Sequence, residues 1–420
     1  MSGNGYPVRR LGEVLQYVRR PITPDQTKTY SLIGVRWYGE GTHLHDMIDG
    51  ATLQAPTLWK VQNDDIIYNK MWTSKGAFAV VTKNTADLFG TSEYPTFIAH
   101  GACPEFLRYT FRQPRFWQLA EAWANGTTER ARLNPKDFLK LPISVPLLPE
   151  QRAIAEVLIA IEDAIARTEA LIGVIGAVKA AVIERFLLNG LTGNDSERRH
   201  GYKSTKWNVV RLRDLAMVQT GISKSENRAH TFPIDVAYLR VANVQDGYLD
   251  LDEVKVIRID RSQMERYRLR VGDVLFNEGG DFDKLGRGCV WSGEIDPCVH
   301  QNHVFAVRCG PKLDPRFLAL FAASRRGKSY FKRSSKQTTN LASINMSDLR
   351  SFPVPVPHLN QQQHIAEIAN CFDLRIFSEI QMFKRLVSIR AAISQELLSG
   401  RLRLPESTIS RHREHSDKMA

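Results

Sequence analysis

Apolar residues in two stretches of the chain recur alternately every four and every three positions. This spacing is typical of a helix that packs along a narrow seam. The stretches are residues 150–190 and 360–400, and each predicts a helix of about 40 residues. The seam residues are Ile154, Leu158, Ile161, Ile165, Ile172, Ile175, Val182 and Phe186 in the first stretch, and Ile365, Phe372, Ile376, Phe383, Leu386, Ile393 and Leu397 in the second.

Polar residues interrupt both seams at equivalent places. Thr168 and Lys179 interrupt the first, and Glu379 and Arg390 interrupt the second. Polar seam residues cost stability but specify register and partner. We therefore expect the two helices to pair with each other as an antiparallel coiled coil. Two independent amphipathic helices, each lying on its own domain, are the alternative.

Short apolar runs between turn residues predict strands on either side of the first helix. Such runs occupy residues 31–38, 65–69, 237–242 and 273–277. We expect an α+β fold with two pseudo-repeated globular domains separated by the two long helices. The expected boundaries are 1–149 and 205–359 for the domains, 150–190 and 360–400 for the helices, 191–204 for a linker, and 401–420 for a polar tail that is disordered from residue 405.

The chain repeats itself at an offset of 211 residues, the separation of Leu141 from Phe352. Residues 65–69 match 273–277 in pattern, and the pair Thr127 and Thr128 recurs further along the chain. Residues 70–100 and 278–312 do not match. The period is too long for a solenoid repeat. A shared scaffold with different inserts suits a protein that contacts two comparable partners at a set separation.

Composition narrows the class of protein. The 420 residues are 43% hydrophobic, and we find no apolar run long enough for a membrane span. The first residues lack the apolar stretch of a signal peptide. Five cysteines without a CxxC pair favour a reducing, cytoplasmic location over a disulfide framework or a zinc site.

The net charge of +12 and a pI near 9.5 point to a polyanionic partner, most simply DNA. Residues 201–357 hold 25 basic against 17 acidic side chains, whereas residues 151–200 hold 6 against 7. The positive charge therefore belongs to the globular parts and not to the first helix.

Basic and amide side chains gather in a few stretches that suit phosphate and base contacts. Residues 321–336 contain six basic residues and no acid. A solvated helix face is the alternative for that stretch. The candidate DNA-binding residues are Lys70, Lys75, Arg108, Arg112, Arg115, Thr127, Thr128, Arg130 and Arg132 in the first domain, and Lys284, Arg287, Arg325, Arg326, Lys328, Lys332, Arg333, Lys336, Gln337, Thr338, Thr339 and Asn340 in the second.

Catalytic motifs are weak. Asn134, Pro135 and Lys136 lack the second proline and the aromatic ring of an adenine methyltransferase tetrapeptide. Residues 326–329 resemble the end of a phosphate loop, but Ala322 stands where its first glycine belongs. No histidine has partners at metal-ligand spacing. We therefore expect neither an active site nor a bound metal or cofactor.

A proline-rich strand runs directly into each predicted helix. The first copy has Pro142, Pro146, Pro149, Glu150 and Gln151, followed by residues 154–156. The second copy keeps Pro353, Pro357, Gln362 and residues 365–367, but has Asn360 and Gln361 in place of Pro149 and Glu150. This departure leaves the capping of the second helix open.

This organisation, over nearly the whole chain, resembles the specificity subunit of type I restriction–modification systems. The resemblance implies a non-catalytic subunit in which each target recognition domain reads one half of a split DNA target. It also implies that the helices dock two methyltransferase subunits and that restriction or translocase subunits join for cleavage. S-adenosylmethionine, ATP and magnesium are then expected on those partners.

Helix length supports the same interpretation. Forty helical residues extend roughly 60 Å, whereas DNA advances about 34 Å per turn. The helices could therefore act as a ruler between two DNA readers. The alternatives are a coiled-coil scaffold that binds acidic proteins, and the specificity half of another restriction–methylation system.

Overall fold

The structure, a computed structural model, describes residues 5–82, 87–126, 131–192, 207–223, 231–280, 285–337 and 342–413. Its contacts divide the chain into two units. The first unit is Met1–Glu169 with Gln381–Ala420, and the second is Ala170–Ile380. Each of the two long helices contributes one part to each unit.

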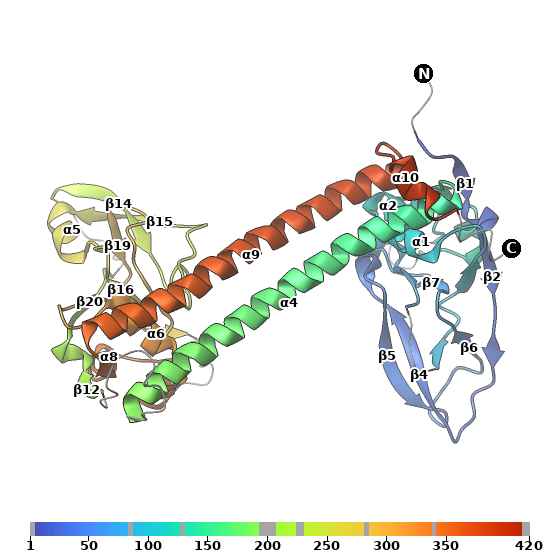
Figure 1. Ribbon diagram of the computed structural model, residues 1–420. Helices are drawn as coiled ribbons and strands as arrows, with labels where there is room; N and C mark the ends of the chain where they lie inside the picture. Colours follow the sequence, from blue (N-terminus) through green and yellow to red (C-terminus); the bar gives the residue numbers. More distant parts are fainter. Residues whose placement is uncertain are drawn as a thin grey trace. The chain divides into compact units, whose positions relative to one another are not determined.

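The first unit contains two main sheets (Figure 1). An antiparallel sheet has the order β2 (Leu15–Val18), β10 (Thr96–Ala99), β7 (Ile66–Tyr68), β8 (Phe78–Val80). The second sheet has the order β3 (Pro21–Ile22), β6 (Leu58–Val61), β9 (Leu88–Gly90), β4 (Thr29–Val35), β5 (Thr42–Asp49). The strand β1 (Val8–Arg10) pairs with β11 (Pro142–Ser144). The unit also contains α1 (Pro104–Phe111), α2 (Pro114–Ala122), α3 (Pro135–Phe138) and the 3-10 turns η1 (Leu11–Glu13), η2 (Trp37–Gly39) and η3 (Thr73–Lys75).

The second unit repeats this topology. Its antiparallel sheet has the order β13 (Ala216–Thr220), β20 (Val304–Cys309), β16 (Val274–Asn277), β18 (Gly288–Val290). A further sheet, β15 (Lys255–Asp260), β14 (Pro233–Leu239), β19 (Cys298–His300), matches β5-β4-β9, including the parallel pairing of its last two strands. The strand β12 (Asn208–Arg211) pairs with β23 (Pro353–Val356), and β17 (Gly279–Gly280), β22 (Ala342–Ser343) and β21 (Lys336–Gln337) form a small sheet. The unit also contains η5 (Leu212–Asp214), α5 (Arg261–Tyr267), α6 (Pro315–Ala323), α7 (Arg325–Ser334) and α8 (Met346–Arg350).

A buried aspartate directly precedes each of the equivalent strands β7 and β16. Asp65 and Asp273 are each 1% exposed. Arg20 Nη1 lies 2.6 Å from Asp65 Oδ2, and Arg308 Nη2 lies 2.7 Å from Asp273 Oδ2. Buried carboxylates need such partners. The repeated pattern at residues 65–69 and 273–277 therefore has a structural role. In each unit the buried ion pair fixes the start of a central strand and so positions the loop that follows it.

The long helices are α4 (Leu148–Thr192) and α9 (Leu359–Ser399). In the first unit, Ile154 near the start of α4 shares a core with Leu397 near the end of α9. In the second unit, Ile183 near the end of α4 shares a core with Ile365 near the start of α9. The helices thus pair antiparallel, and the predicted α+β fold class is confirmed. Every seam residue named above is buried or half-buried.

The two polar seam residues of α4 find partners. Lys179 Nζ lies 2.5 Å from Asp373 Oδ1 on the other helix, within the second unit. The Thr168 hydroxyl donates to the Ala164 carbonyl of its own helix at 2.8 Å. One of the two interruptions of the first seam therefore links the helices, and the other is satisfied locally.

A buried glutamine fastens the start of each long helix. Gln151 Oε1 accepts the Cys103 N–H at 2.8 Å, and its amide donates to the Pro146 carbonyl at 2.8 Å. Gln362 Oε1 accepts the Asp314 N–H at 2.8 Å, and its amide donates to the Pro357 carbonyl at 2.9 Å. The repeated proline–glutamine motif therefore joins each helix to the preceding turn and to the start of α1 or α6.

The C-terminal segment explains why the first copy alone has a glutamate beside that glutamine. Two guanidinium nitrogens of Arg403 lie 2.7 Å from the carboxylate oxygens of Glu150, and the guanidinium stacks 4.8 Å from the centre of the Tyr6 ring. Gln361 stands at this position in the second copy, and its neutral amide cannot form an ion pair. Glu150 therefore anchors the C-terminal segment after α9, which has no counterpart in the other copy of the repeat.

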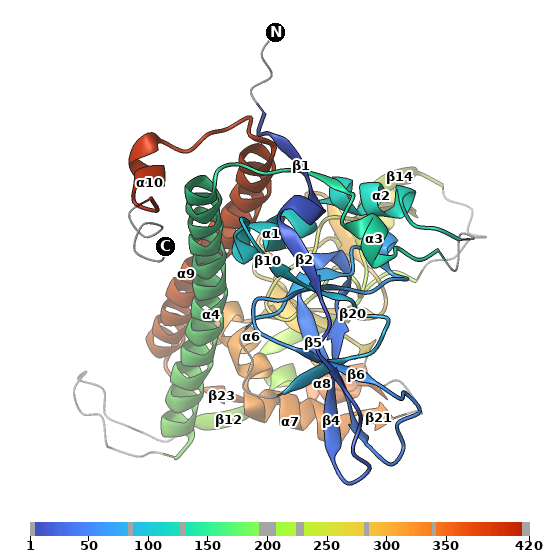
Figure 2. The ribbon, with the colours of Figure 1, turned by 90° about the vertical axis from the view of Figure 1, so that its right-hand side faces the viewer.

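The prediction of a disordered tail from residue 405 is wrong for residues 405–413. The helix α10 (Glu406–Ser410) buries Ile409, and His412 Nε2 lies 2.8 Å from Glu156 Oε2. Figure 2 shows α10 and α1 on opposite sides of the start of α4. One apolar residue among polar ones creates no helical period, and its contacts come from the distant start of α4. Sequence pattern alone therefore could not find this helix.

The described cysteines are free thiols, and four of them are buried or half-buried. Burial raises the pKa of Cys103, Cys289, Cys298 and Cys309 to about 12 in each case. Among the described residues, no helix combines the length and the apolar character that a bilayer span requires.

Candidate nucleic-acid interface

Two loops that are far apart in sequence meet in the first unit. The loop after β7 begins at Asn69, and the Lys70 carbonyl accepts the Leu133 N–H at 3.0 Å. Arg132 Nη2 lies 3.6 Å from Met71 Sδ, and its Nη1 lies 3.0 Å from Glu93 Oε1. The structure therefore brings together Lys70 and Arg132, which the sequence analysis selected from separate stretches.

The equivalent loops meet in the second unit. The strand β17, in the loop after β16, pairs with β22, and β22 pairs with β21, which carries Lys336. The Ile344 N–H donates to the Glu278 carbonyl at 2.8 Å. The backbone contact of the first unit thus recurs, in the form of a small sheet.

The helix α7 carries most of the basic stretch. Ser324 caps it by accepting the Gly327 N–H with its hydroxyl at 3.2 Å, and Phe331 is buried. Arg325, Arg326, Lys332 and Arg333 are exposed. The helix therefore places its cations on the solvent side because its one large apolar side chain faces the core.

A turn at residues 245–247 gathers further candidate residues. Arg287 Nη1 donates to Gln245 Oε1 at 2.9 Å, and Lys328 Nζ lies 2.6 Å from Asp246 Oδ2. This turn was not among the candidates predicted from the sequence. Its Asp246-Gly247 pair is only a turn signal, so nothing in the sequence indicated that it orients two cations.

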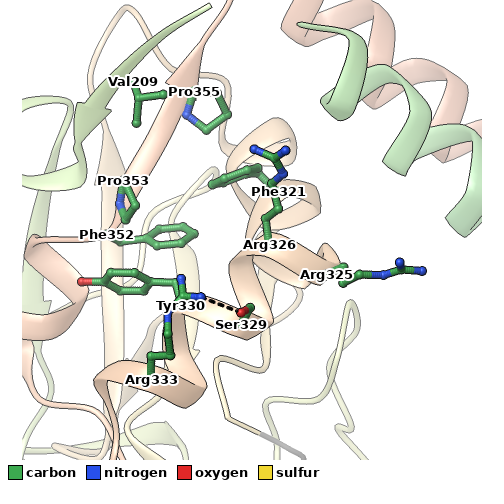
Figure 3. Close-up of a pocket in the computed structure, with 10 residues that line it drawn as sticks. All are labelled: Val209, Phe321, Arg325, Arg326, Ser329, Tyr330, Arg333, Phe352, Pro353 and Pro355. Carbon is green, nitrogen blue, oxygen red and sulfur yellow. Dashed lines mark hydrogen bonds between the residues drawn. The ribbon is translucent and has the colours of Figure 1, made fainter. Parts of the chain in front are cut away.

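A pocket of about 450 Å³ opens between α7 and the pair β12–β23 (Figure 3). Its walls are apolar side chains with arginines and two polar groups beside them: Val209, Phe321, Arg325, Arg326, Ser329, Tyr330, Arg333, Phe352, Pro353 and Pro355. The Tyr330 ring lies 5.2 Å from that of Phe352, and Arg333 Nη1 donates to Ser329 Oγ at 3.0 Å. Figure 3 shows the Arg325 guanidinium extending away from the other residues.

Two arginines of α1 and its C-terminus form ion pairs inside the first unit. Arg108 Nη2 lies 3.0 Å from Glu162 Oε2 of α4, and Arg112 pairs with the other oxygen of the same carboxylate. The Tyr109 hydroxyl also donates to Glu162 at 2.9 Å, and burial raises the pKa of Tyr109 to about 12. A phosphate would have to compete with Glu162 for these arginines. Lys75 and Arg115, in contrast, are exposed.

Several predicted contacts lie outside the described residues. These are Thr127, Thr128, Arg130, Lys284, Thr338, Thr339 and Asn340, and only the backbone of Gln337 is described. Three exposed aromatic residues, Trp37, Tyr38 and Trp72, were not among the predicted contacts. Aromatic residues are usually read as core, so the sequence carried no signal of their exposure.

Within the ranges that the structure describes, no group of three or more histidine, cysteine, aspartate or glutamate side chains is arranged to hold a metal ion.

A family model described as type I restriction modification DNA specificity domain matches residues 4–175 and 204–381. The type I restriction enzyme MjaVIII specificity subunit of Methanocaldococcus jannaschii is 22% identical over 415 residues, 95% of this chain and 93% of that one. The EcoKI specificity subunit of Escherichia coli K12 is 24% identical over 247 residues, 56% of this chain. The matched part spans about half (51%) of the EcoKI subunit.

Solved structures share the fold. The HsdS subunit from Thermoanaerobacter tengcongensis matches with a TM-score of 0.52 and 16% identity, over 95% of this chain and 97% of that one. The type I S subunit from M. genitalium matches with a TM-score of 0.52 and 15% identity, over 94% and 97%. At these identities the likeness concerns the fold alone.

Proposed function

The chain belongs to the family of type I restriction–modification DNA specificity subunits, and we propose that each unit reads one half of a bipartite DNA target. Specificity subunits are the recognition components of their systems.

The recurrence of two converging loops carries the proposal. In both units the loop after β7 or β16 meets a segment just before a short helix, α3 in the first unit and α8 in the second. Basic residues lie at each meeting point, Lys70 and Arg132 in one unit and Lys336 in the other. Cations position a protein on phosphates, whereas neighbouring polar groups and divergent loops read bases. Similar frames with different loops suit two different half-sites.

The long helices supply the spacing in this proposal. The 45 residues of α4 extend roughly 68 Å, about two turns of DNA. A helical pair resists bending more than a linker of loose coil does. The unread spacer of the target would then depend on helix length.

Exposed apolar residues along the helices support docking of methyltransferase subunits. In the second unit, Leu171, Val174 and Val178 of α4 are 39%, 58% and 45% exposed, and Leu374 and Phe377 of α9 are each 62% exposed. Their spacing places each set on one helix face. Exposed apolar stripes of this kind mark protein interfaces.

The proposed subunit has no chemistry of its own. Methyl transfer and cleavage would belong to two methyltransferase subunits and to restriction or translocase subunits, which would carry S-adenosylmethionine, ATP and magnesium. The free thiols fit a reducing compartment such as the cytoplasm, where the DNA of a prokaryotic cell lies.

The test is to co-express the chain with its methyltransferase subunit and to map methylated sequences in the genome. We expect two short specific sequences separated by a constant number of unread bases. Lys70→Ala should relax only one of them, and Arg287→Ala only the other. Lys28→Ala removes an exposed positive charge of the first unit outside these loops and should leave the target unchanged.

A single continuous target would contradict two-part reading. Relaxation of both halves by each substitution would contradict the assignment of one unit to one half. Binding that plain duplex DNA does not displace, but an acidic protein does, would favour the coiled-coil scaffold instead.

A further inference from the structure

Three aromatic rings of the first unit form a contiguous exposed group in which Trp37 contacts the other two. Trp37, Tyr38 and Trp72, here called the aromatic shelf, are 45%, 53% and 42% exposed. The Trp37 ring centre lies 5.5 Å from that of Trp72 and 6.4 Å from that of Tyr38. Contiguous exposed apolar surface on a folded protein usually marks a binding site, and nothing above gives these rings a role.

The fold holds the shelf in one arrangement. Tyr38 has φ 60°, in the left-handed region that a residue other than glycine seldom adopts. The Gly39 N–H donates to the Gly76 carbonyl at 2.8 Å, and Arg112 Nε donates to the Gly39 carbonyl at 3.0 Å. The two turns that carry the shelf are thus fastened to each other and to α1. A preformed surface loses little entropy when it binds.

Trp117, which belongs to α2, packs against the Tyr38 ring of the shelf. The Trp117 ring centre lies 5.7 Å from that of Tyr38. A Cβ at Gly76 would lie 2.4 Å from the Trp117 ring, so only glycine lets the turn approach so closely. The Trp117 indole N–H donates to the Phe111 carbonyl at 2.6 Å. The exposed rings therefore rest on a fixed support.

The shelf adjoins the converging loops of the first unit. Trp72 follows Lys70 by two residues, and Met71 between them contacts Arg132. The two shelf turns, residues 36–41 and 69–76, contain Arg36, Lys70 and Lys75 against a single acid, Glu40. Flat rings within a positive rim match a nucleic acid, which offers base faces between phosphates.

We propose that the aromatic shelf stacks on a base step of the DNA that is partly unstacked at the edge of the first half-site. The inference rests on the proposed function and adds the contact that distinguishes the two units. In the second unit, the positions after Asn277 are Glu278 and Gly279, so the equivalent loop starts without an aromatic residue. Stacking by a residue at the position of Trp72 is therefore expected at the first half-site only.

The experiment uses the full chain with its methyltransferase subunit and a duplex of the methylated target. The duplex carries 2-aminopurine, which becomes brighter when unstacked, at each position beside the first half-site in turn. For Trp37→Ala/Trp72→Ala we expect affinity to fall roughly five- to 150-fold, the range for loss of a stacking aromatic side chain. The salt dependence of binding should stay unchanged because no phosphate contact is lost. The fluorescence increase should disappear.

Trp123→Ala is the matched control, because Trp123 is a 38% exposed tryptophan of the same unit outside the shelf. It should leave affinity and fluorescence unchanged. Trp72→Phe keeps a stacking ring and should retain most of the affinity, even where the double alanine variant folds poorly.

Unchanged affinity of the double variant, or of a Trp72→Leu variant that folds normally, would overturn the proposal. So would loss of the methyltransferase subunit with DNA affinity retained, because the shelf would then be a protein interface. A smaller salt dependence would mean that the substitution acts on phosphate contacts instead. Failure of the parent complex to bind the duplex would refute the proposed function itself, a separate result.

Discussion

Removing the buried glutamine at the start of α9 should loosen the second unit at one defined place. The Gln362 side chain is fully buried, and it bonds to the Asp314 N–H at 2.8 Å and to the Lys312 and Pro357 carbonyls at 2.9 Å each. Gln362→Met keeps the volume of the side chain but leaves three polar groups without this partner, and two of them, the Asp314 N–H and the Pro357 carbonyl, are buried. At about 1 kcal/mol for each buried group and less for the partly buried Lys312 carbonyl, we expect a loss of roughly 2–3 kcal/mol.

The equivalent change in the first unit should cost less. Gln151 has two side-chain hydrogen bonds, to the Cys103 N–H and the Pro146 carbonyl, so Gln151→Met should cost roughly 2 kcal/mol. Gln363→Ala is the control, because this neighbouring glutamine is only half-buried.

Hydrogen exchange resolved by peptide is the suitable assay, because two units need not unfold together. Gln362→Met should speed exchange at the starts of α6 and α9 and leave α1 unaffected. Gln151→Met should speed exchange at the starts of α1 and α4 and leave α6 unaffected. Equal exchange for Gln362→Met and Gln363→Ala would refute the argument that these bonds hold the helix entry in place.

Four other outcomes are expected. Alanine at Lys328, Lys332 and Arg333 should weaken DNA binding and lower the slope of log affinity against log salt by about 0.9 per lost phosphate contact; parallel salt plots would argue against phosphate contact. Inserting seven residues into both α4 and α9 adds roughly 10 Å and should lengthen the unread spacer by about three base pairs. An unchanged methylated sequence would contradict the idea that helix length sets the spacer. Burial lowers the pKa of His300 from 6.5 to about 4, so the unfolded chain takes up a proton that the folded unit excludes. Stability should therefore fall by roughly 3 kcal/mol from pH 6.5 to 4, in urea titrations, and less in His300→Gln. Arg403→Ala leaves the buried Glu150 carboxylate without its ion-pair partner and should speed hydrogen exchange in residues 400–413. Exchange in the rest of the chain should stay at the parent rate, and a general increase would contradict a local anchor.

The sequence by itself determined the periodic parts of this protein. The heptad seams, the strand at residues 65–69 and its copy at 273–277, and the proline–glutamine motif were all visible, because a helix or strand with one buried face repeats apolar residues at its own period. The duplication was visible because both copies must solve the same packing problem. These features sufficed for the fold class and for the family resemblance.

Only the tertiary structure decided which side chains are available for binding. Arg108 and Arg112 looked like free cations in the sequence, but Glu162, some 50 residues away, takes both of them. Glu150 meets Arg403 across most of the chain, and Trp72 stays exposed although its residue type suggests a core position. Contacts between distant residues produce no periodic pattern in the local sequence. Which residue pairs with a charge, and whether a ring is buried, depends on how separate helices and strands pack.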